Sequence, residues 1–400
     1  MGMAEYTYTI NILFVVNLLK RRGAEEQLFN FMKALPQNLK VSIFSFSDKD
    51  CEFPEFMEQR GIDIYSNPYQ GTFNVLKFKA LYNYLSIRRF DVVITTGLGA
   101  ALFFGRLCAL LRGIGVVYSN LNTMINFHNA PKRKEDYFDL FNKFLNRAIP
   151  IIPGKRRFTF MPNSETLAKM VRLQEGRYPI QVLYNGFLVE EFDRSFSHYA
   201  SSEKIHYILS LIQNNRIIAQ VGALDENKNY LFTLNCIKDI KKTISDVRVL
   251  IVGDGDMRTQ LESRVFENGL QKEVIFTGQL NREECLYLMS RSDLLVLTSK
   301  SESFPNVLAE AHALSKPVVT LNVGAASEIV EDGVTGYVIR DNDENIFKER
   351  IIKLLSDNNL ANTMGENGKR RVFELFSMDR KVQQFLAMMK KDFDFAGKPL

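Results

Sequence analysis

Two glutamates, Glu302 and Glu310, are separated by seven residues in the second half of the chain. The apolar run Leu294–Leu297 precedes them and is typical of a strand buried on both faces. Pro305 suits the first turn of a helix, where its missing N–H group is not needed. We expect that helix to reach about Leu314. Glu310 then lies about five residues into it, roughly 7–8 Å along the axis.

This spacing places a carboxylate on each side of a helix start. The free backbone N–H groups near Ser303–Val307 form an anion site, and carboxylates accept hydrogen bonds well from pairs of hydroxyl groups. A nucleoside diphosphate sugar has the matching layout, with ribose hydroxyls, a pyrophosphate and then sugar hydroxyls. The sequence therefore indicates a sugar-nucleotide site here. The alternative is a helix N-terminal charge and a solvated glutamate without a ligand.

Strands and helices alternate along both halves of the chain. In the first half we expect strands at 10–16, 40–46, 62–65, 91–95, 115–119, 159–161 and 181–183. In the second half we expect strands at 216–221, 247–252, 274–276, 294–297 and 317–321. Helical patterns of 10–15 residues separate many of these runs, which is typical of βαβ units around a parallel sheet. The predicted fold is α/β, with two Rossmann-like, doubly wound parallel-sheet domains facing a cleft.

The length of 400 residues accommodates two domains of this kind. The polar stretch 187–202 marks the boundary, which predicts a domain at 1–190, a second at 191–375, and a C-terminal helix and tail at 376–400 that crosses back to the first. The amphipathic run Asp379–Lys391 is expected to dock as that helix. Because ligands bind where parallel strands end, the cleft between the domains is the natural site.

The net charge of +5 is unevenly distributed. Residues 1–200 hold 25 lysines and arginines against 18 aspartates and glutamates, a net charge of +7, and the remainder has −2. A basic half favours an anionic partner, such as a phosphate-bearing acceptor or a membrane surface. A solvated face with helix C-terminal charges is the alternative. We expect no nucleic acid as a partner, since no nucleic-acid motif accompanies these charges.

The four cysteines are widely spaced and form no Cys-x-x-Cys pair, so neither a zinc site nor a disulfide framework is indicated. No apolar run reaches the roughly 18–20 residues that span a bilayer, and residues 1–9 lack the basic start of a signal peptide. We expect a cytoplasmic protein that associates peripherally with the inner face of the cell membrane.

The segment from Ser299 to Ala311 resembles the Glu-x7-Glu motif of retaining family 4 glycosyltransferases, which have the GT-B fold, of the bacterial cell-surface polysaccharide and lipopolysaccharide type. The similarity extends over most of the second half, in order and spacing. It includes Val221-Gly-Ala-Leu with Lys228, Ile251-Val-Gly-Asp-Gly-Asp, Phe276-Thr-Gly, Asp293-Leu-Leu-Val-Leu-Thr-Ser and the run from Gly324 to Gly336. Weaker matches in the first half are Gly23-Ala-Glu, Asn163-Ser164 and Leu183-Tyr-Asn-Gly186.

The resemblance implies roles for these residues. Glu310 holds the ribose hydroxyls, and Lys228 pairs with the pyrophosphate and neutralises the leaving group. Glu302 holds the donor sugar, and Glu302 and Lys228 are the catalytic candidates. Gly222 lines the nucleotide site, and the backbone of the helix start contributes the remaining donor contacts, from Ser303, Phe304, Pro305, Asn306 and Val307. The resemblance further implies retention of the anomeric configuration, with no metal and no cofactor besides the nucleotide-sugar co-substrate.

The first half supplies candidate residues for binding the acceptor or the donor phosphate. They are Gly23, Ala24, Glu25, Asn122 and His128. Two positions depart from the family pattern. Many relatives have an arginine where this chain has Ala223, and many have a histidine at a position that corresponds to Leu121. His128 lies close enough in sequence to be considered as a substitute.

The expected function is transfer of a sugar from a nucleotide-diphosphate sugar, with UDP favoured, to a hydroxyl of a glycan or lipid-linked acceptor. Two alternatives stay open. One is a non-catalytic sugar-nucleotide-binding or scaffold subunit of a glycan assembly complex, which Ala223 and Leu121 favour. The other is a nucleotide-sugar 2-epimerase on the same fold. The Asp254-Gly-Asp256 sequence is interpreted as the start of a helix capped by Asp256 rather than as a metal site.

Overall fold

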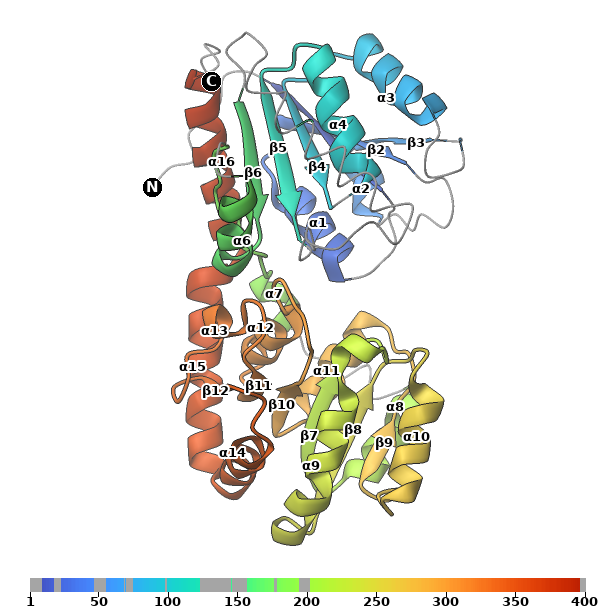
Figure 1. Ribbon diagram of the computed structural model, residues 1–400, viewed down its shortest axis with the longest axis vertical. Coiled ribbons are helices and arrows are strands. Elements are labelled where there is room, and N and C mark those ends of the chain that lie inside the picture. Colours follow the sequence, from blue (N-terminus) through green and yellow to red (C-terminus); the bar gives the residue numbers. More distant parts are fainter. Residues whose placement is uncertain are drawn as a thin grey trace. The chain divides into compact units, whose positions relative to one another are not determined.

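The computed structural model describes residues 9–17, 23–46, 55–67, 69, 75–97, 99–122, 145, 157–175, 178–193 and 202–395. The chain divides into two compact units, one formed by residues 1–186 and 378–400 and the other by residues 187–377. Each unit contains a six-stranded parallel sheet with helices packed on it (Figure 1). The predicted α/β class with two Rossmann-like sheets is confirmed. The sequence-based divisions at 190/191 and 375/376 compare with 186/187 and 377/378 in the structure.

The sheet of the first unit has the strand order β3-β2-β1-β4-β5-β6. Its strands are β1 (Ile10–Val16), β2 (Leu39–Ser45), β3 (Asp63–Ser66), β4 (Val92–Thr96), β5 (Val116–Leu121) and β6 (Arg157–Pro162). Its helices are α1 (Gly23–Ala34), α2 (Phe56–Gln59), α3 (Val75–Ile87), α4 (Ala100–Leu111), α6 (Glu165–Glu175) and α16 (Met378–Phe395). The central strands are buried along most of their length because helices lie on both faces.

Alternate residues of these strands serve two different cores, as the period of two requires. Leu13 and Val15 of β1 belong to the cluster that α3 and α4 cover. Phe14 lies between them in sequence and packs against Phe31 of α1, with ring centroids 6.5 Å apart. Phe385 of α16 then contacts Phe31 edge to face at 5.1 Å. The C-terminal helix is therefore part of the core of the first unit.

The sheet of the second unit has the strand order β12-β11-β10-β7-β8-β9. Its strands are β7 (Arg216–Val221), β8 (Val247–Val252), β9 (Val274–Phe276), β10 (Leu294–Leu297), β11 (Val318–Leu321) and β12 (Gly336–Ile339). Its longer helices are α8 (Glu203–Ile212), α9 (Tyr230–Thr243), α10 (Arg258–Glu267), α11 (Arg282–Ser290), α12 (Asn306–Ala313), α14 (Glu344–Ser356) and α15 (Asn358–Phe376). Shorter turns of helix are α7 (Val189–Phe192), the 3₁₀ helix η3 (Glu226–Lys228) and α13 (Ala326–Ile329).

Two faces are again distinguished by alternation. Ile218 and Ile251 belong to the core that includes α9 and α14, whereas Ile217 and Leu250 pack with α8 and α11. Arg216 begins β7 level with Val247 of β8, and the register continues to Val221 beside Val252. The two strands therefore end together, which sets the position of the loops that follow them.

One expected strand is absent. Residues 181–183 run beside β6 and donate backbone hydrogen bonds from Gln181 to Phe160 and from Leu183 to Pro162, each at 2.9 Å. The only bridge between these two segments joins Phe160 and Ile180. Pro162 has no N–H group to return a hydrogen bond, so a regular ladder cannot continue. The prediction of a strand at 181–183 is wrong for this reason. Strand β12 and helix α8 were not predicted from the sequence.

Among the described residues, no helix has the length and the apolar character needed to cross a membrane.

Candidate functional site

The centre of the second sheet contains a topological switch point. Strand β7 lies between β10 and β8, and the chain passes from β7 to β8 on one side and from β10 to β11 on the other. Loops that follow neighbouring strands and leave in opposite directions form the crevice where doubly wound sheets bind ligands. The loop after β7 contains Gly222 and Lys228, and the loop after β10 contains Glu302. The two halves of the predicted motif therefore meet at this crevice.

Hydrogen bonds join these two loops directly. The backbone N–H of Lys300 donates to the carbonyl of Asn227 at 2.7 Å, and Asn227 Nδ2 donates to the carbonyl of Ser301 at 2.9 Å. Below them, the Thr298 hydroxyl lies 3.0 Å from the carbonyl oxygen of Asn229 and accepts a hydrogen bond from Gln220 Nε2 at 2.9 Å. The positions of Lys228 and Glu302 are thus fixed relative to each other by backbone as well as by side chains.

The side chains of Lys228 and Glu302 form an ion pair at the top of these loops. Lys228 Nζ lies 2.6 Å from Glu302 Oε1, and the side chains are 23% and 15% exposed. Lys228 ends η3, whose N-cap residue Asp225 accepts a hydrogen bond from the Lys228 backbone N–H at 3.0 Å. Both predicted catalytic residues are therefore partly accessible, and each is the ion-pair partner of the other.

Two glycines allow backbone to approach this pair closely. Gly222 has a φ of +152°, and a Cβ atom there would lie 3.3 Å from Lys228 Cε. Gly324 has a φ of +53°, and a Cβ atom there would lie 1.9 Å from the carbonyl oxygen of Glu302. The N–H of the next residue, Ala325, donates to the carbonyl of Ser303 at 3.2 Å. A side chain at position 324 would have to displace the Glu302 turn.

Tyr230 supports the Gly222 turn from beneath. Its hydroxyl donates to the Gly222 carbonyl oxygen at 2.8 Å. Burial raises the pKa of the Tyr230 hydroxyl, with a smaller contribution from Asp225. The phenol therefore stays protonated and remains a donor to the turn.

The helix after Glu302 begins one residue later than expected. Pro305 occupies the N-cap position, and α12 runs from Asn306 to Ala313. Ser303, Asn306 and Val307 are half-buried, whereas the Phe304 ring is buried against Phe376 and Phe187, at 5.4 and 6.4 Å between centroids. Phe304 thus anchors the helix start to the core, and what it can offer a ligand is its backbone.

Glu310 lies on α12 and is bound by an arginine that the sequence did not single out. Arg282 Nη1 lies 2.8 Å from Glu310 Oε1. Arg282 also binds Glu191 through Nε at 2.6 Å and Nη2 at 3.2 Å. Burial lowers the pKa of the Arg282 guanidinium, but the charges of Glu310 and Glu191 outweigh this effect and raise it. The guanidinium is therefore permanently charged between two carboxylates.

A local signal for Arg282 was present in the sequence. It is the first residue of α11, whose N-terminus has a capping box formed by Asn281 and Glu284. A positive charge at a helix N-terminus opposes the helix dipole, which suggests that a carboxylate compensates it. Glu191 had no comparable signal, because it comes from α7, 91 positions away.

The remaining predicted residues lie in the first unit or outside the described residues. Gly23, Ala24 and Glu25 form the first turn of α1, where Glu25 is half-buried. Asn122 directly follows β5 and is also half-buried. His128 lies outside the described residues. Leu121, the position compared with a family histidine, ends β5 and is buried in the core of the first unit.

Ala223 is exposed, directly after Gly222. The nearby Asp254 accepts a hydrogen bond from the Gly255 N–H at 2.8 Å and lies 3.5 Å from Arg258. The expectation that Asp256 caps α10 is wrong, since the N-cap residue is Met257 and no side chain caps this helix. The N–H of Arg258 donates to the carbonyl oxygen of Gly255 at 3.0 Å and closes a turn before the helix, so Asp256 lies one residue too early to be its N-cap.

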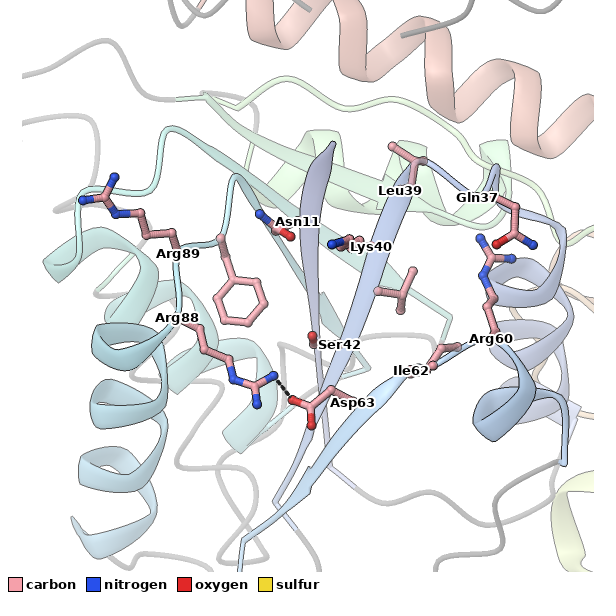
Figure 2. Close-up of a pocket in the computed structure, with 13 residues that line it drawn as sticks. Asn11, Gln37, Leu39, Lys40, Ser42, Arg60, Ile62, Asp63, Arg88 and Arg89 are labelled. Atoms are coloured by element: carbon pink, nitrogen blue, oxygen red, sulfur yellow. Dashed lines mark hydrogen bonds and ion pairs between the residues drawn. The ribbon is translucent and has the colours of Figure 1, made fainter. Parts of the chain in front are cut away.

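A pocket of about 570 Å³ opens at a different place, where the strands of the first sheet begin (Figure 2). Two of its basic side chains, Arg60 and Arg88, have structural partners. Arg60 donates to four carbonyl oxygens at the end of α1, those of Met32, Lys33, Leu35 and Pro36. Arg88 forms an ion pair with Asp63, shown by the dashed line in Figure 2. These charges compensate a helix C-terminus and a carboxylate, so the pocket does not compete with the crevice of the second unit as a donor site.

Known proteins match the second unit and, at lower identity, most of the chain. Residues 201–371 match the model of the family described as glycosyl transferases group 1. An uncharacterized glycosyltransferase of Methanocaldococcus jannaschii is 36% identical over 149 residues, which is 37% of this chain and 41% of that relative. The Escherichia coli UDP-Gal:alpha-D-GlcNAc-diphosphoundecaprenol alpha-1,3-galactosyltransferase is 25% identical over 311 residues, 76% of each chain. The solved structure of Anabaena HepE in complex with UDP has a TM-score of 0.76 at 20% identity, covering 96% of this chain and 100% of that one.

Proposed function

We propose that this protein transfers a sugar from a UDP-sugar to a hydroxyl of a glycan or lipid-linked acceptor in cell-surface polysaccharide or lipopolysaccharide synthesis. The proposal starts from the match of residues 201–371 to the group 1 glycosyltransferases and from the GT-B fold. The observation that carries the proposal is the meeting of Lys228 and Glu302 at the switch point, with Glu310 on the helix between β10 and β11. A cation and two carboxylates there match the diphosphate, the sugar and the ribose of such a donor.

The chemistry follows from these groups. Cleavage of the bond between the anomeric carbon and the diphosphate oxygen builds negative charge on the leaving group. Lys228 and the N–H groups at the start of α12 stabilise that charge without a metal ion. Glu302 accepts hydrogen bonds from the hydroxyls of the transferred sugar. The acceptor oxygen bonds to the anomeric carbon on the face that the diphosphate leaves, and its proton passes to the diphosphate, so the configuration is retained.

The contact between Lys228 and Glu302 has to be exchanged in this reaction. Because Lys228 Nζ is bound to Glu302, the diphosphate must draw the ammonium group away from the carboxylate or share it. The exchange replaces one ion pair by another, while Glu302 becomes available to the sugar. Binding of the complete donor therefore uses both members of the pair.

Two similarities support uridine as the donor base. The E. coli relative is named for UDP-Gal, and the HepE structure contains UDP. Both similarities concern other proteins.

We also propose that the first unit docks on the anionic inner face of the cell membrane, where lipid-linked acceptors reside. Ile87 ends α3 and is 82% exposed, and Leu111 ends α4 and is 56% exposed. The exposed Arg89 follows α3, and the exposed Lys40 lies at the start of β2 in the pocket of Figure 2. Among the described residues, no carboxylate pairs with Arg89 or Lys40. Exposed apolar side chains, together with cations that have no carboxylate partner among the described residues, suit an anionic lipid surface.

A binding and turnover panel tests the enzymatic proposal. UDP-, GDP- and ADP-sugars are added to the wild type and to Lys228→Ala, and thermal shift and donor hydrolysis are recorded. A UDP-sugar should raise the melting temperature of the wild type, since it binds only the folded state, and it should be slowly hydrolysed. A shift without turnover would favour the non-catalytic binding subunit, and conversion to an isomeric nucleotide sugar would favour the epimerase. No shift with any nucleotide would overturn the donor site.

A further inference from the structure

Among the described residues, the Glu310 carboxylate has a hydrogen-bond partner at one of its two oxygens. Arg282 Nη1 binds Oε1 at 2.8 Å, and no hydrogen bond from the described residues reaches Oε2. The side chain is 13% exposed, so a ligand can reach it while most of it stays buried. The charged hydrogen bond restrains Oε1, and Oε2 stays available to a ligand.

Arg282 is itself held from the opposite side. Glu191 takes Nε and Nη2 in a two-point contact at 2.6 and 3.2 Å, and the Arg282 side chain is largely buried. The guanidinium is planar and rigid, so fixing two of its nitrogens fixes the direction of the third. The row Glu191–Arg282–Glu310 thus links α7 to the carboxylate on α12 through the guanidinium, so the place of Glu191 influences the place of the Glu310 carboxylate.

We propose that Arg282, held by Glu191, is a positioning residue that orients Glu310 for the ribose hydroxyls, and that this row makes the site select ribonucleotides over 2′-deoxyribonucleotides. The proposal rests on the donor site proposed above. A freely rotating glutamate could accept a hydrogen bond from either ribose hydroxyl after small adjustments. A carboxylate held by Arg282 through Oε1 has less freedom to turn Oε2, so it compensates less for a missing 2′-hydroxyl.

The test compares the dissociation constants of UDP and 2′-deoxy-UDP by calorimetry, with the GDP and ADP pairs measured in parallel. Wild-type protein should bind the ribonucleotide on the order of tenfold or more tightly, which is the usual effect of one hydrogen bond to a charged group. Glu310→Gln should remove most of this preference. Glu191→Gln and Arg282→Lys should reduce it several-fold, although Glu191 touches no ligand in the proposal.

The ratio between the two nucleotides separates positioning from folding. A variant that merely loosens the domain weakens both nucleotides equally and leaves the ratio unchanged. Glu331→Gln is the control, because it breaks an ion pair elsewhere in the same unit, to Arg371 at 3.1 Å, and should leave the ratio at the wild-type value.

Three outcomes are decisive. A lower ratio in both Glu191→Gln and Arg282→Lys supports the row as a selector. An unchanged ratio in both variants, with UDP still bound, overturns this inference and leaves the proposed function standing. Failure of wild-type protein to bind any of the three ribonucleotides overturns the proposed function, and the inference with it.

Discussion

Lys228 Nζ lies 2.6 Å from Glu302 Oε1, so the two residues predicted to act in catalysis neutralise each other. They are 74 positions apart in the sequence and meet because β7 and β10 are neighbours in the sheet. This pairing implies that substitutions of the two residues affect nucleotide binding in different ways.

Lys228→Gln should weaken UDP binding by about ten- to a hundredfold, since it removes a charged hydrogen bond to the diphosphate. Glu302→Gln should leave UDP binding unchanged or strengthen it, because the ammonium group no longer has a competing carboxylate. Both variants should lose sugar transfer. Calorimetry with UDP and a transfer assay measure the two effects, and equal weakening of UDP binding by both substitutions would contradict the exchange of partners.

Gly324→Ala should destabilise the second unit and weaken donor binding. Its positive φ alone costs an alanine about 1–2 kcal/mol, and the added methyl group would lie 1.9 Å from the Glu302 carbonyl oxygen. Gly333→Ala is the control, with a φ of +78° but nothing within 4 Å of the new atom. Urea unfolding and UDP affinity are compared for both. The Glu302 turn is not the sensitive element if the two alanines behave alike.

Ala223→Arg should strengthen UDP binding by roughly tenfold, because a second cation beside Lys228 can contact the diphosphate. Ala223 is exposed, so the larger side chain needs no rearrangement of the core. Ala223→Glu should weaken binding by the same electrostatic argument. A titration of the three proteins with UDP gives the answer, and an order other than arginine, alanine, glutamate would place the diphosphate elsewhere.

Membrane docking of the first unit should depend on the salt concentration and on the exposed residues at the end of the sheet where its strands begin. Wild-type protein should cosediment with phosphatidylglycerol-containing vesicles at low ionic strength and be released at high ionic strength. Ile87→Ser and Arg89→Ser should each reduce the bound fraction. Leu173→Ser is the matched control, because Leu173 on α6 is 88% exposed but has no part in the proposed surface. Equal loss in the control, or no binding to anionic vesicles at all, would exclude this surface.

The free energy of unfolding should rise with pH between about 7 and 10 because of Lys381. Burial lowers the pKa of Lys381 from 10.5 to about 7, and its Nζ lies over the Phe31 ring at 4.9 Å. Between these two values the unfolded chain binds the extra proton, so stability increases with pH there, by about 1.4 kcal/mol for each unit of pKa shift. Below pH 7 the full penalty for burying the charge remains.

Lys381→Met should remove most of this pH dependence and stabilise the protein at pH 7 and below. Urea unfolding followed by circular dichroism at pH 6.5, 8 and 9.5 measures the change. Lys390→Met on the same helix provides the comparison, because Lys390 is exposed and should leave the profile as in the wild type. If the stability of the wild type does not change across this range, burial does not lower the pKa of Lys381.

Local sequence determined the elements and the class of fold. Short β-branched runs, buried on both faces, alternate with amphipathic stretches, and this alternation is enough to indicate parallel sheets. The spacing of Glu302 and Glu310 across a helix start likewise follows from local geometry, and α12 begins within one residue of the expected position. The absence of a strand at 181–183 has a chemical cause in the sequence, the missing N–H group of Pro162. The sequence alone does not show that residues 181–183 lie beside β6.

Tertiary structure alone decided which charges meet. Nothing near Lys228 in sequence points to Glu302, and nothing near Glu310 points to Arg282 or Glu191. These five residues come from five different loops or helices, and their contacts depend on the order β10-β7-β8 and on the packing of α7, α11 and α12 in the second unit. Periodicity reports which face of an element is buried, whereas an ion pair needs two side chains within about 4 Å, and that distance is set only when the strands have been ordered and the helices packed.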